Sequence, residues 1–151
     1  MRILAVDDDD LTLSILPIVL ADAGYNDVTL YNSSEAALAC IESGKRVYDC
    51  LFFDIVMPFM HGIELCRRVR ALPGYKKTPI IMLTAFSDAS DVNEAYEAGA
   101  TDFITKPFDL TEIGACVRKM EIMFPRNTNP QNIEKAKAAP PNIFQIRCKH
   151  A

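Results

Sequence analysis

A run of four apolar residues, 50–53, ends directly at Asp54, and this feature limits the possible folds more than any other. Short apolar runs bounded by turn signals are typical of strands that are buried on both faces, as in parallel sheets. Pro58 and Gly62 follow and predict a loop. Open α/β sheets bind ligands at their carboxyl edge, where the strands end. We therefore expect a parallel sheet with Asp54 in its ligand-binding crevice.

Apolar runs alternate with helical patterns along most of the chain. The expected strands cover residues 2–6, 27–31, 50–53, 79–83 and 102–105. The expected helices cover about residues 11–23, 32–42, 62–71, 88–98 and 109–123. This alternation predicts an α/β fold over residues 1–124, with a doubly wound, five-stranded parallel sheet covered by helices on both faces. The strand order 2-1-3-4-5 is common in such flavodoxin-like three-layer sandwiches.

Local signals modify one of the expected helix starts and support two others. Pro17 lies inside the first helix and predicts a kink or a later start, because an interior proline costs about 3 kcal/mol. Asn32 with Glu35, and Asp109 with Glu112, have the spacing of capping boxes. We therefore expect Asn32 and Asp109 to begin the second and fifth helices.

Composition narrows the class of protein. Half of the 151 residues are hydrophobic, which is ordinary for a globular protein. The net charge of −4 and the pI near 5.1 disfavour direct binding of nucleic acid. No apolar run is long enough for a membrane span, and we expect a cytoplasmic protein with reduced thiols. The cysteines are scattered without the spacing of a metal site: Cys40, Cys50, Cys66, Cys116 and Cys148.

The composition changes after about Phe124. Several prolines and asparagines interrupt any pattern in residues 125–151, which we expect to form a C-terminal extension or linker and not a separate output domain. Two alternatives stay open: a protein that acts alone, and the N-terminal piece of a longer regulator.

Polar residues end four of the expected strands: Asp7 and Asp8, Asp54, Thr84, and Lys106. Right-handed crossovers bring all these strand ends to one edge of the sheet. Neighbouring strands lie about 4.8 Å apart, and a long lysine stem can cross two strands. Three carboxylates packed together raise one another's pKa, and a divalent cation resolves that conflict. Ligands that are all oxygen favour Mg²⁺, with Mn²⁺ as an alternative ion.

This arrangement predicts phosphoryl chemistry. With a cation bound, Asp54 can act as a nucleophile on a phosphoryl donor. Catalysis of phosphoryl transfer consists mainly of positioning and charge stabilisation. The Lys106 ammonium and the Thr84 hydroxyl are the expected contacts to the transferred group.

Several separated motifs resemble the receiver domain of two-component response regulators, including chemotaxis receivers. The motifs are Val6-Asp7-Asp8, Asp54 with Met57-Pro58 and Gly62, Leu83-Thr84-Ala85, and Lys106-Pro107-Phe108. The resemblance covers residues 2 to about 122 and implies that a histidine kinase or a histidine phosphotransfer protein phosphorylates Asp54. It also implies that Asp8, Asp54 and the Val56 backbone carbonyl bind Mg²⁺ directly, that Asp7 binds it mostly through water, and that the Lys106–Pro107 peptide is cis.

The resemblance further implies a signalling switch that catalyses its own phosphorylation and dephosphorylation. Thr84 would move towards the phosphate, and Phe103 would rotate inward behind it. The surface of helix 88–98, strand 102–105 and helix 109–123 would then bind a downstream protein, with a homodimer on activation as a further expectation. The first helix would dock the phosphodonor, through outer apolar residues that we expect to include Ile15 and Val19. Core packing alone is the alternative role of these residues.

Two other classes of protein share parts of this residue pattern. A phosphatase with an aspartyl nucleophile needs a second Asp two residues after the first, where this chain has Val56. A degenerate receiver that acts only as a protein-binding module would normally lack one of the acidic residues or the lysine, and this chain has them all. The sequence therefore favours the switch.

Overall fold

The computed structural model describes residues 1–85 and 88–125, so the expected C-terminal extension lies almost entirely outside the described residues. Five parallel strands form one sheet in the order β2-β1-β3-β4-β5, as the sequence predicted. The strands are β1 (Arg2–Val6), β2 (Asp27–Tyr31), β3 (Cys50–Asp54), β4 (Ile80–Thr84) and β5 (Asp102–Thr105). Three bounds differ from the prediction by one residue: β3 ends one residue later, and β4 starts and ends one residue later, so Asp54 and Thr84 are the last residues of their strands.

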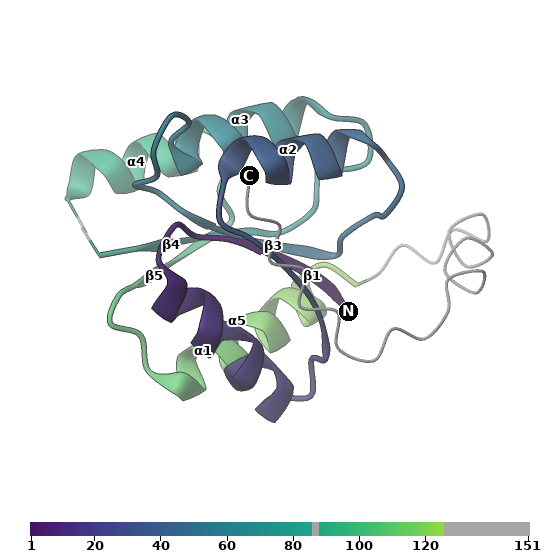
Figure 1. The fold of residues 1–151 in the computed structure, drawn as a ribbon, viewed down its shortest axis with the longest axis vertical. Coiled ribbons are helices and arrows are strands. Elements are labelled where there is room, and N and C mark those ends of the chain that lie inside the picture. The colour runs from purple at the N-terminus through teal and green to yellow at the C-terminus, as the bar shows by residue number, and fades with distance from the viewer. Residues whose placement is uncertain (86–87, 126–151) are drawn as a thin grey trace.

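Five helices cover the two faces of the sheet. They are α1 (Asp10–Asp22), α2 (Ser34–Glu42), α3 (Gly62–Ala71), α4 (Ala89–Glu97) and α5 (Leu110–Met123). Helices α2, α3 and α4 lie together on one face, and α1 and α5 lie on the other (Figure 1). Within the described ranges, none of these helices has the length and apolar character needed to cross a lipid bilayer.

The central strands are buried on both faces, as their continuous apolar runs predicted. In β3, Leu51 and Phe53 pack in the core beneath α2, α3 and α4, whereas Cys50 and Phe52 pack beneath α1 and α5. All residues of β3 and β4 are buried. Side chains alternate between the faces of a strand, so a strand with a helical layer on each side needs an apolar residue at every position.

The helix starts correct two expectations. The later start of α1 is wrong, because Asp9 caps the helix before Pro17 is reached: its carboxylate accepts hydrogen bonds from the backbone N–H groups of Leu11 and Thr12. The cap of α2 is Ser33 and not Asn32, since the Ser33 hydroxyl accepts from the Ala36 N–H. Asp109 caps α5 as predicted.

The outer face of α1 also differs from the prediction. Val19 is buried, and Ile15 is half-buried against the core beneath α1 and α5. The exposed apolar residues of α1 are Leu11 and Ile18. With seven apolar residues spread around one helix, the sequence did not determine which of them face the sheet.

Candidate functional site

The ends of four strands bring the predicted site residues to one edge of the sheet. Asp7 and Asp8 directly follow β1, and Asp54 ends the neighbouring strand β3. Thr84 ends β4, and Lys106 follows β5, whose last residue is paired with Thr84. The parallel register therefore gathers residues that are up to 99 positions apart in the chain.

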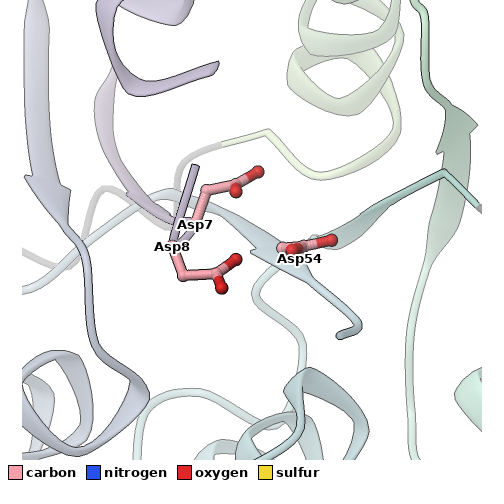
Figure 2. A group of neighbouring side chains, drawn as sticks. All are labelled: Asp7, Asp8 and Asp54. Carbon is pink, nitrogen blue, oxygen red and sulfur yellow. The ribbon is translucent and has the colours of Figure 1, made fainter. Parts of the chain in front are cut away.

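The three carboxylates form one cluster. Each of Asp7, Asp8 and Asp54 offers an oxygen, and these oxygens all lie within 4.8 Å of one another. Figure 2 shows the three side chains beside each other at the ends of the two strands. Asp7 and Asp54 are buried, whereas Asp8 is exposed. The cluster is therefore open to solvent on the side of Asp8.

Lys106 is the cation of this cluster. Its Nζ lies 2.6 Å from Asp7 Oδ2, to which it donates a hydrogen bond, and 3.7 Å from Asp54 Oδ1. The other oxygen of Asp7 accepts a hydrogen bond from the Asp9 backbone N–H at 2.9 Å. Lys106 thus reaches across to the carboxylates as predicted, and its shorter contact is with Asp7 and not with Asp54.

One ammonium does not neutralise three carboxylates. Burial raises the pKa of Asp54 to about 7, the Asp7 carboxylate adds to the increase, and Lys106 opposes it. Burial also raises the pKa of Asp7, against the hydrogen bonds from Lys106 and the Asp9 N–H. The predicted increase is confirmed in direction, although burial contributes more to it than repulsion between the acids.

The donor set fits a hard divalent cation. All side-chain donors are carboxylate oxygens, which are the ligands that Mg²⁺ prefers. Mg²⁺ usually keeps several waters, and the exposed side of the cluster has room for them. Burial and the nearby Asp7 carboxylate raise the pKa of Asp54, and a bound cation would instead favour its ionised form.

Thr84 and Phe103 lie in the two strands next to the acidic cluster. Thr84 is 1% exposed at the end of β4, two strands from Asp7 in the sheet. Phe103 is half-buried in β5 and packs against the core beneath α2, α3 and α4. Its partner in register is Met82, a residue of that same core. The structure thus places Phe103 against the face that α4 covers.

The loop between β3 and α3 is tightly bent. Gly62 N–H donates to the Ile55 carbonyl at 2.9 Å, and a Cβ at Gly62 would lie 1.8 Å from the Asp54 carbonyl oxygen. Only glycine permits this approach, so Gly62 fixes the path of the chain directly after Asp54. On the far side of the site, the Lys106–Pro107 peptide is cis, as expected.

The sequence missed one residue that contacts this loop. Ser34 is fully buried at the start of α2, and its hydroxyl donates to the Met60 carbonyl at 2.9 Å. Its partner lies 26 positions away, and no local pattern joins the two residues. The only signal was a polar residue on the side of α2 that must face the core, beside Ala37 and Leu38.

Comparisons with known proteins agree with this geometry. The family model of the response regulator receiver domain matches residues 3–118. The DNA-binding response regulator MtrA of Mycolicibacterium smegmatis is 40% identical over 117 residues, which are 78% of this chain and 49% of that protein. The chain therefore spans about half the length of these curated relatives.

Two solved structures extend the similarity to the fold and the site. The chemotaxis protein CheY4 of Vibrio cholerae is 33% identical with a TM-score of 0.73, over 79% of this chain and 97% of that chain. The receiver domain of the sensor histidine kinase PA1611 of Pseudomonas aeruginosa is 28% identical with a TM-score of 0.68, over 83% and 98% of the two chains. That structure has a magnesium ion coordinated in its active-site cleft.

Together, the sheet order, the acidic cluster and these matches assign the chain to a class. It belongs to the response regulator receiver domain family, whose members are signalling switches of two-component systems.

Proposed function

We propose that this domain accepts a phosphoryl group on Asp54 from a phosphohistidine donor, and that the acylphosphate switches a surface for protein binding. The observation that carries the proposal is the cluster of Asp7, Asp8 and Asp54 within 4.8 Å, with Lys106 as its cation. Buried like charges with a raised pKa are typical of functional sites and are costly in a purely structural one.

Each side chain has a role in the transfer. An Asp54 carboxylate oxygen attacks phosphorus, a P–O bond forms, and the P–N bond to the donor imidazole breaks, so that the electron pair leaves with the ring nitrogen. Lys106 Nζ, 3.7 Å from Asp54 Oδ1, faces the negative charge that arrives with the phosphoryl oxygens. The Thr84 hydroxyl is the second donor, one strand away from Asp54.

The proposed Mg²⁺ ligands are Asp8, Asp54 and the Val56 backbone carbonyl, with Asp7 held mainly through water. The hydrogen bonds of Asp7 to Lys106 and to the Asp9 N–H support this division, because they already use both of its oxygens. Mg²⁺ bound there, or Mn²⁺ in its place, would neutralise charge on the carboxylates and the phosphoryl oxygens. The magnesium ion in the PA1611 receiver domain supports the assignment.

The switch is proposed to act through Thr84 and Phe103. Movement of Thr84 towards the phosphate would leave room for Phe103 to turn further inward, and this would alter the surface of α4, β5 and α5. Phe has no hydroxyl, so packing alone would carry the signal. The partners are a histidine kinase or histidine phosphotransfer protein as donor and a downstream protein as target, with a homodimer on activation as one outcome.

The relatives named as DNA-binding regulators match this chain over about half of their length. DNA binding is therefore not assigned to the receiver domain, whose net negative charge disfavours it. The phosphatase alternative is disfavoured by Val56, which stands where that chemistry needs a second acid. The binding-only alternative is disfavoured by the complete acidic cluster and Lys106.

Intact mass after incubation with acetyl phosphate tests the proposal. The wild type should gain one phosphoryl group in the presence of Mg²⁺ and none in EDTA. Asp54→Asn should gain none, because an amide oxygen is not the required nucleophile. Asp10→Asn is the matched control, since it removes an exposed carboxylate that begins α1 near the same edge of the sheet.

The outcomes test the acceptor role and separate it from the binding-only module. Phosphorylation of Asp10→Asn but not of Asp54→Asn supports the acceptor role. Phosphorylation of Asp54→Asn at the wild-type rate contradicts it. If the folded wild type binds Mg²⁺ but accepts phosphate neither from acetyl phosphate nor from a phosphorylated histidine phosphotransfer protein, the binding-only module is the better description.

A further inference from the structure

Ser34 links α2 to the loop that follows the acceptor strand. Its side chain is fully buried, and its hydroxyl donates to the Met60 carbonyl oxygen at 2.9 Å. The same hydroxyl lies 3.5 Å from the Met57 sulfur. Both partners belong to the short loop between β3 and α3, which also contains Val56. A buried hydroxyl with a defined acceptor holds its partner more firmly than an exposed one, since water does not compete for it.

The contact reaches the most strained part of this loop. Phe59 has a φ of 65°, and it is the one non-glycine residue with positive φ in the part of the chain that the structure describes. Met60 N–H donates to the Pro58 carbonyl at 2.8 Å, which is the i to i+2 hydrogen bond of a γ-turn centred on Phe59. A γ-turn with positive φ is rare and strained.

The strain is not compensated by the Phe59 side chain, which is 99% exposed. A backbone in a sparsely populated conformation persists when its surroundings determine it. The residues that determine it here are at the two ends of the turn. Gly62 N–H donates to the Ile55 carbonyl and closes the base of the loop, and Ser34 holds the Met60 carbonyl at its tip.

We propose that Ser34 is a positioning residue of the metal site, which fixes the path of the loop that carries the Val56 carbonyl. Val56 lies between the two anchored points, one residue after Ile55 and four before Met60. This inference rests on the proposed function, because it takes the Val56 carbonyl as a ligand. Ser34 touches no reacting atom and acts only through the loop.

The chain contains a matched control one residue away. Ser33 is at the same helix start, and its hydroxyl accepts from the Ala36 N–H as the cap of α2. Ser33→Ala removes a helix cap and leaves the loop contact in place, whereas Ser34→Ala removes the loop contact and leaves the cap in place. The two variants therefore separate helix stability from loop positioning.

The experiment measures Mg²⁺ affinity by calorimetry and amide hydrogen exchange of the metal-free protein. In Ser34→Ala, the Mg²⁺ Kd should rise about threefold to tenfold, less than the 10–100-fold loss typical of residues bonded directly to a ligand. Exchange of the Met60 N–H should accelerate at least tenfold, because the γ-turn opens. In Ser33→Ala, the thermal midpoint should fall while the Mg²⁺ Kd stays within about twofold of wild type.

A Mg²⁺ Kd and a Met60 exchange rate in Ser34→Ala that both equal those of the wild type overturn the proposal. Equal losses of Mg²⁺ affinity in the two variants also overturn it, since they would show a general effect of α2. If Ser34→Ala does not fold, Ser34→Cys keeps the size and a weak donor, and should give intermediate values of both quantities. If the wild type binds no Mg²⁺, the proposed function fails, and the Met60 exchange rate still decides whether Ser34 holds the loop.

Discussion

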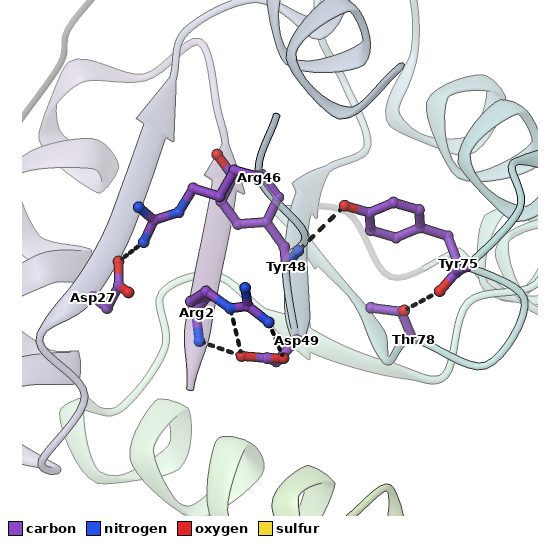
Figure 3. Close-up of polar contacts among 8 residues, drawn as sticks. Arg2, Asp27, Arg46, Tyr48, Asp49, Tyr75 and Thr78 are labelled. Atoms are coloured by element: carbon purple, nitrogen blue, oxygen red, sulfur yellow. Dashed lines mark hydrogen bonds and ion pairs between the residues drawn. The ribbon is translucent and has the colours of Figure 1, made fainter. Parts of the chain in front are cut away.

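The amino and carboxyl edges of the sheet differ in how their buried charged groups are paired. At the amino edge, where the strands begin, Arg2 and Asp49 form an ion pair (Figure 3). The Arg2 guanidinium donates to both carboxylate oxygens of Asp49 at 3.2 and 3.3 Å, and the Arg2 backbone N–H donates to Asp49 Oδ2 at 2.6 Å. In return, the Asp49 N–H donates to the Arg2 carbonyl at 2.8 Å. Beside them, the Tyr48 N–H donates to the Tyr75 hydroxyl.

Arg70 completes this edge without any carboxylate. Its guanidinium donates to the carbonyls of Gly99, Tyr75 and Thr78 and to the Thr101 hydroxyl. One half-buried cation thus joins the end of α3 to the segments before β4 and β5. At the amino edge, then, Arg2 is paired with one carboxylate, and Arg70 is bonded to four oxygen acceptors within the chain.

The carboxyl edge has the opposite balance, with one ammonium for three carboxylates. Its consequence is the pKa of Asp54, which burial and Asp7 raise to about 7. At the amino edge, Arg2 and Arg70 are bonded to acceptors within the chain. The carboxyl edge has more negative charge than the Lys106 ammonium can neutralise, and a bound cation would offset the rest. Buried carboxylates that the chain itself does not neutralise therefore indicate where the functional site lies.

The largest effect is expected at the carboxyl edge, from Gly62→Ala. The new Cβ would lie 1.8 Å from the Asp54 carbonyl oxygen, so the backbone that carries the acceptor must shift. We expect a loss of about 4 kcal/mol in the free energy of unfolding, measured in urea, together with weaker Mg²⁺ binding. Gly44→Ala is the control, with a smaller loss and unchanged Mg²⁺ binding, because nothing lies within 4 Å of its Cβ. Equal losses in both variants would contradict the packing argument.

Arg70→Met should break the amino edge and leave the carboxyl edge intact. The substitution removes the donor from three backbone carbonyls and from Thr101, while it keeps most of the apolar stem. We expect a loss of about 3 kcal/mol in urea unfolding, with Mg²⁺ affinity unchanged. Arg68→Met, which removes an exposed α3 residue paired with Glu64, should cost at most about 0.5 kcal/mol. A change of Mg²⁺ affinity in Arg70→Met would show that the two edges are coupled.

Asp54→Asn should stabilise the metal-free protein at high pH. The folded protein protonates Asp54 near pH 7 and the unfolded chain near pH 4, so between these values the folded state binds more protons, and stability falls as the pH rises. Relative to Asp54→Asn, the wild type should therefore lose stability between about pH 4 and pH 7. At pH 8 in EDTA, Asp54→Asn should exceed the wild type by about 2 kcal/mol in urea unfolding, with a smaller pH dependence.

The control for this prediction is Asp10→Asn, which should keep the wild-type pH dependence because Asp10 is exposed. Addition of Mg²⁺ should reverse the order of stability, since the ion binds the folded wild type and offsets the charge of Asp54. A difference in stability between Asp54→Asn and the wild type that stays constant from pH 4 to pH 7 in EDTA would refute the raised pKa of Asp54.

The smallest effect is expected from an ion pair that belongs to neither edge. Arg67 on α3 and Glu94 on α4 are about half exposed, with Arg67 Nη2 2.9 Å from Glu94 Oε1. Glu94→Gln should change the free energy of unfolding by no more than about 0.5 kcal/mol, and the difference should disappear in high salt. A loss above about 1 kcal/mol would show that exposed pairs contribute as much as the buried edges.

Most of the fold could be predicted because its signals are local or depend on order along the chain. The continuous apolar runs of β3 and β4 predicted strands with two covered faces, and Asp54 at the end of β3 predicted the edge at which ligands bind. Asp109 was predicted as a cap from its own residue type and position. In contrast, Asn32 was preferred to Ser33, since both are good capping residues and the spacing to Glu35 favoured the wrong one.

Residue types and their order along the chain were enough to predict the strand and helix order, the excess of negative charge at one edge, and the residues gathered there: Asp7, Asp8, Asp54, Thr84 and Lys106. The tertiary fold sets the contacts between distant segments, which no sequence pattern specified. In the fold, Lys106 makes its shorter contact with Asp7, and Ser34 donates a hydrogen bond to the Met60 carbonyl. On α1, Val19 is buried and Ile18 is exposed. The physical reason is that residue type and spacing fix what a segment can do locally, whereas a hydrogen bond across 26 or 99 positions depends on how packed layers orient two side chains toward each other.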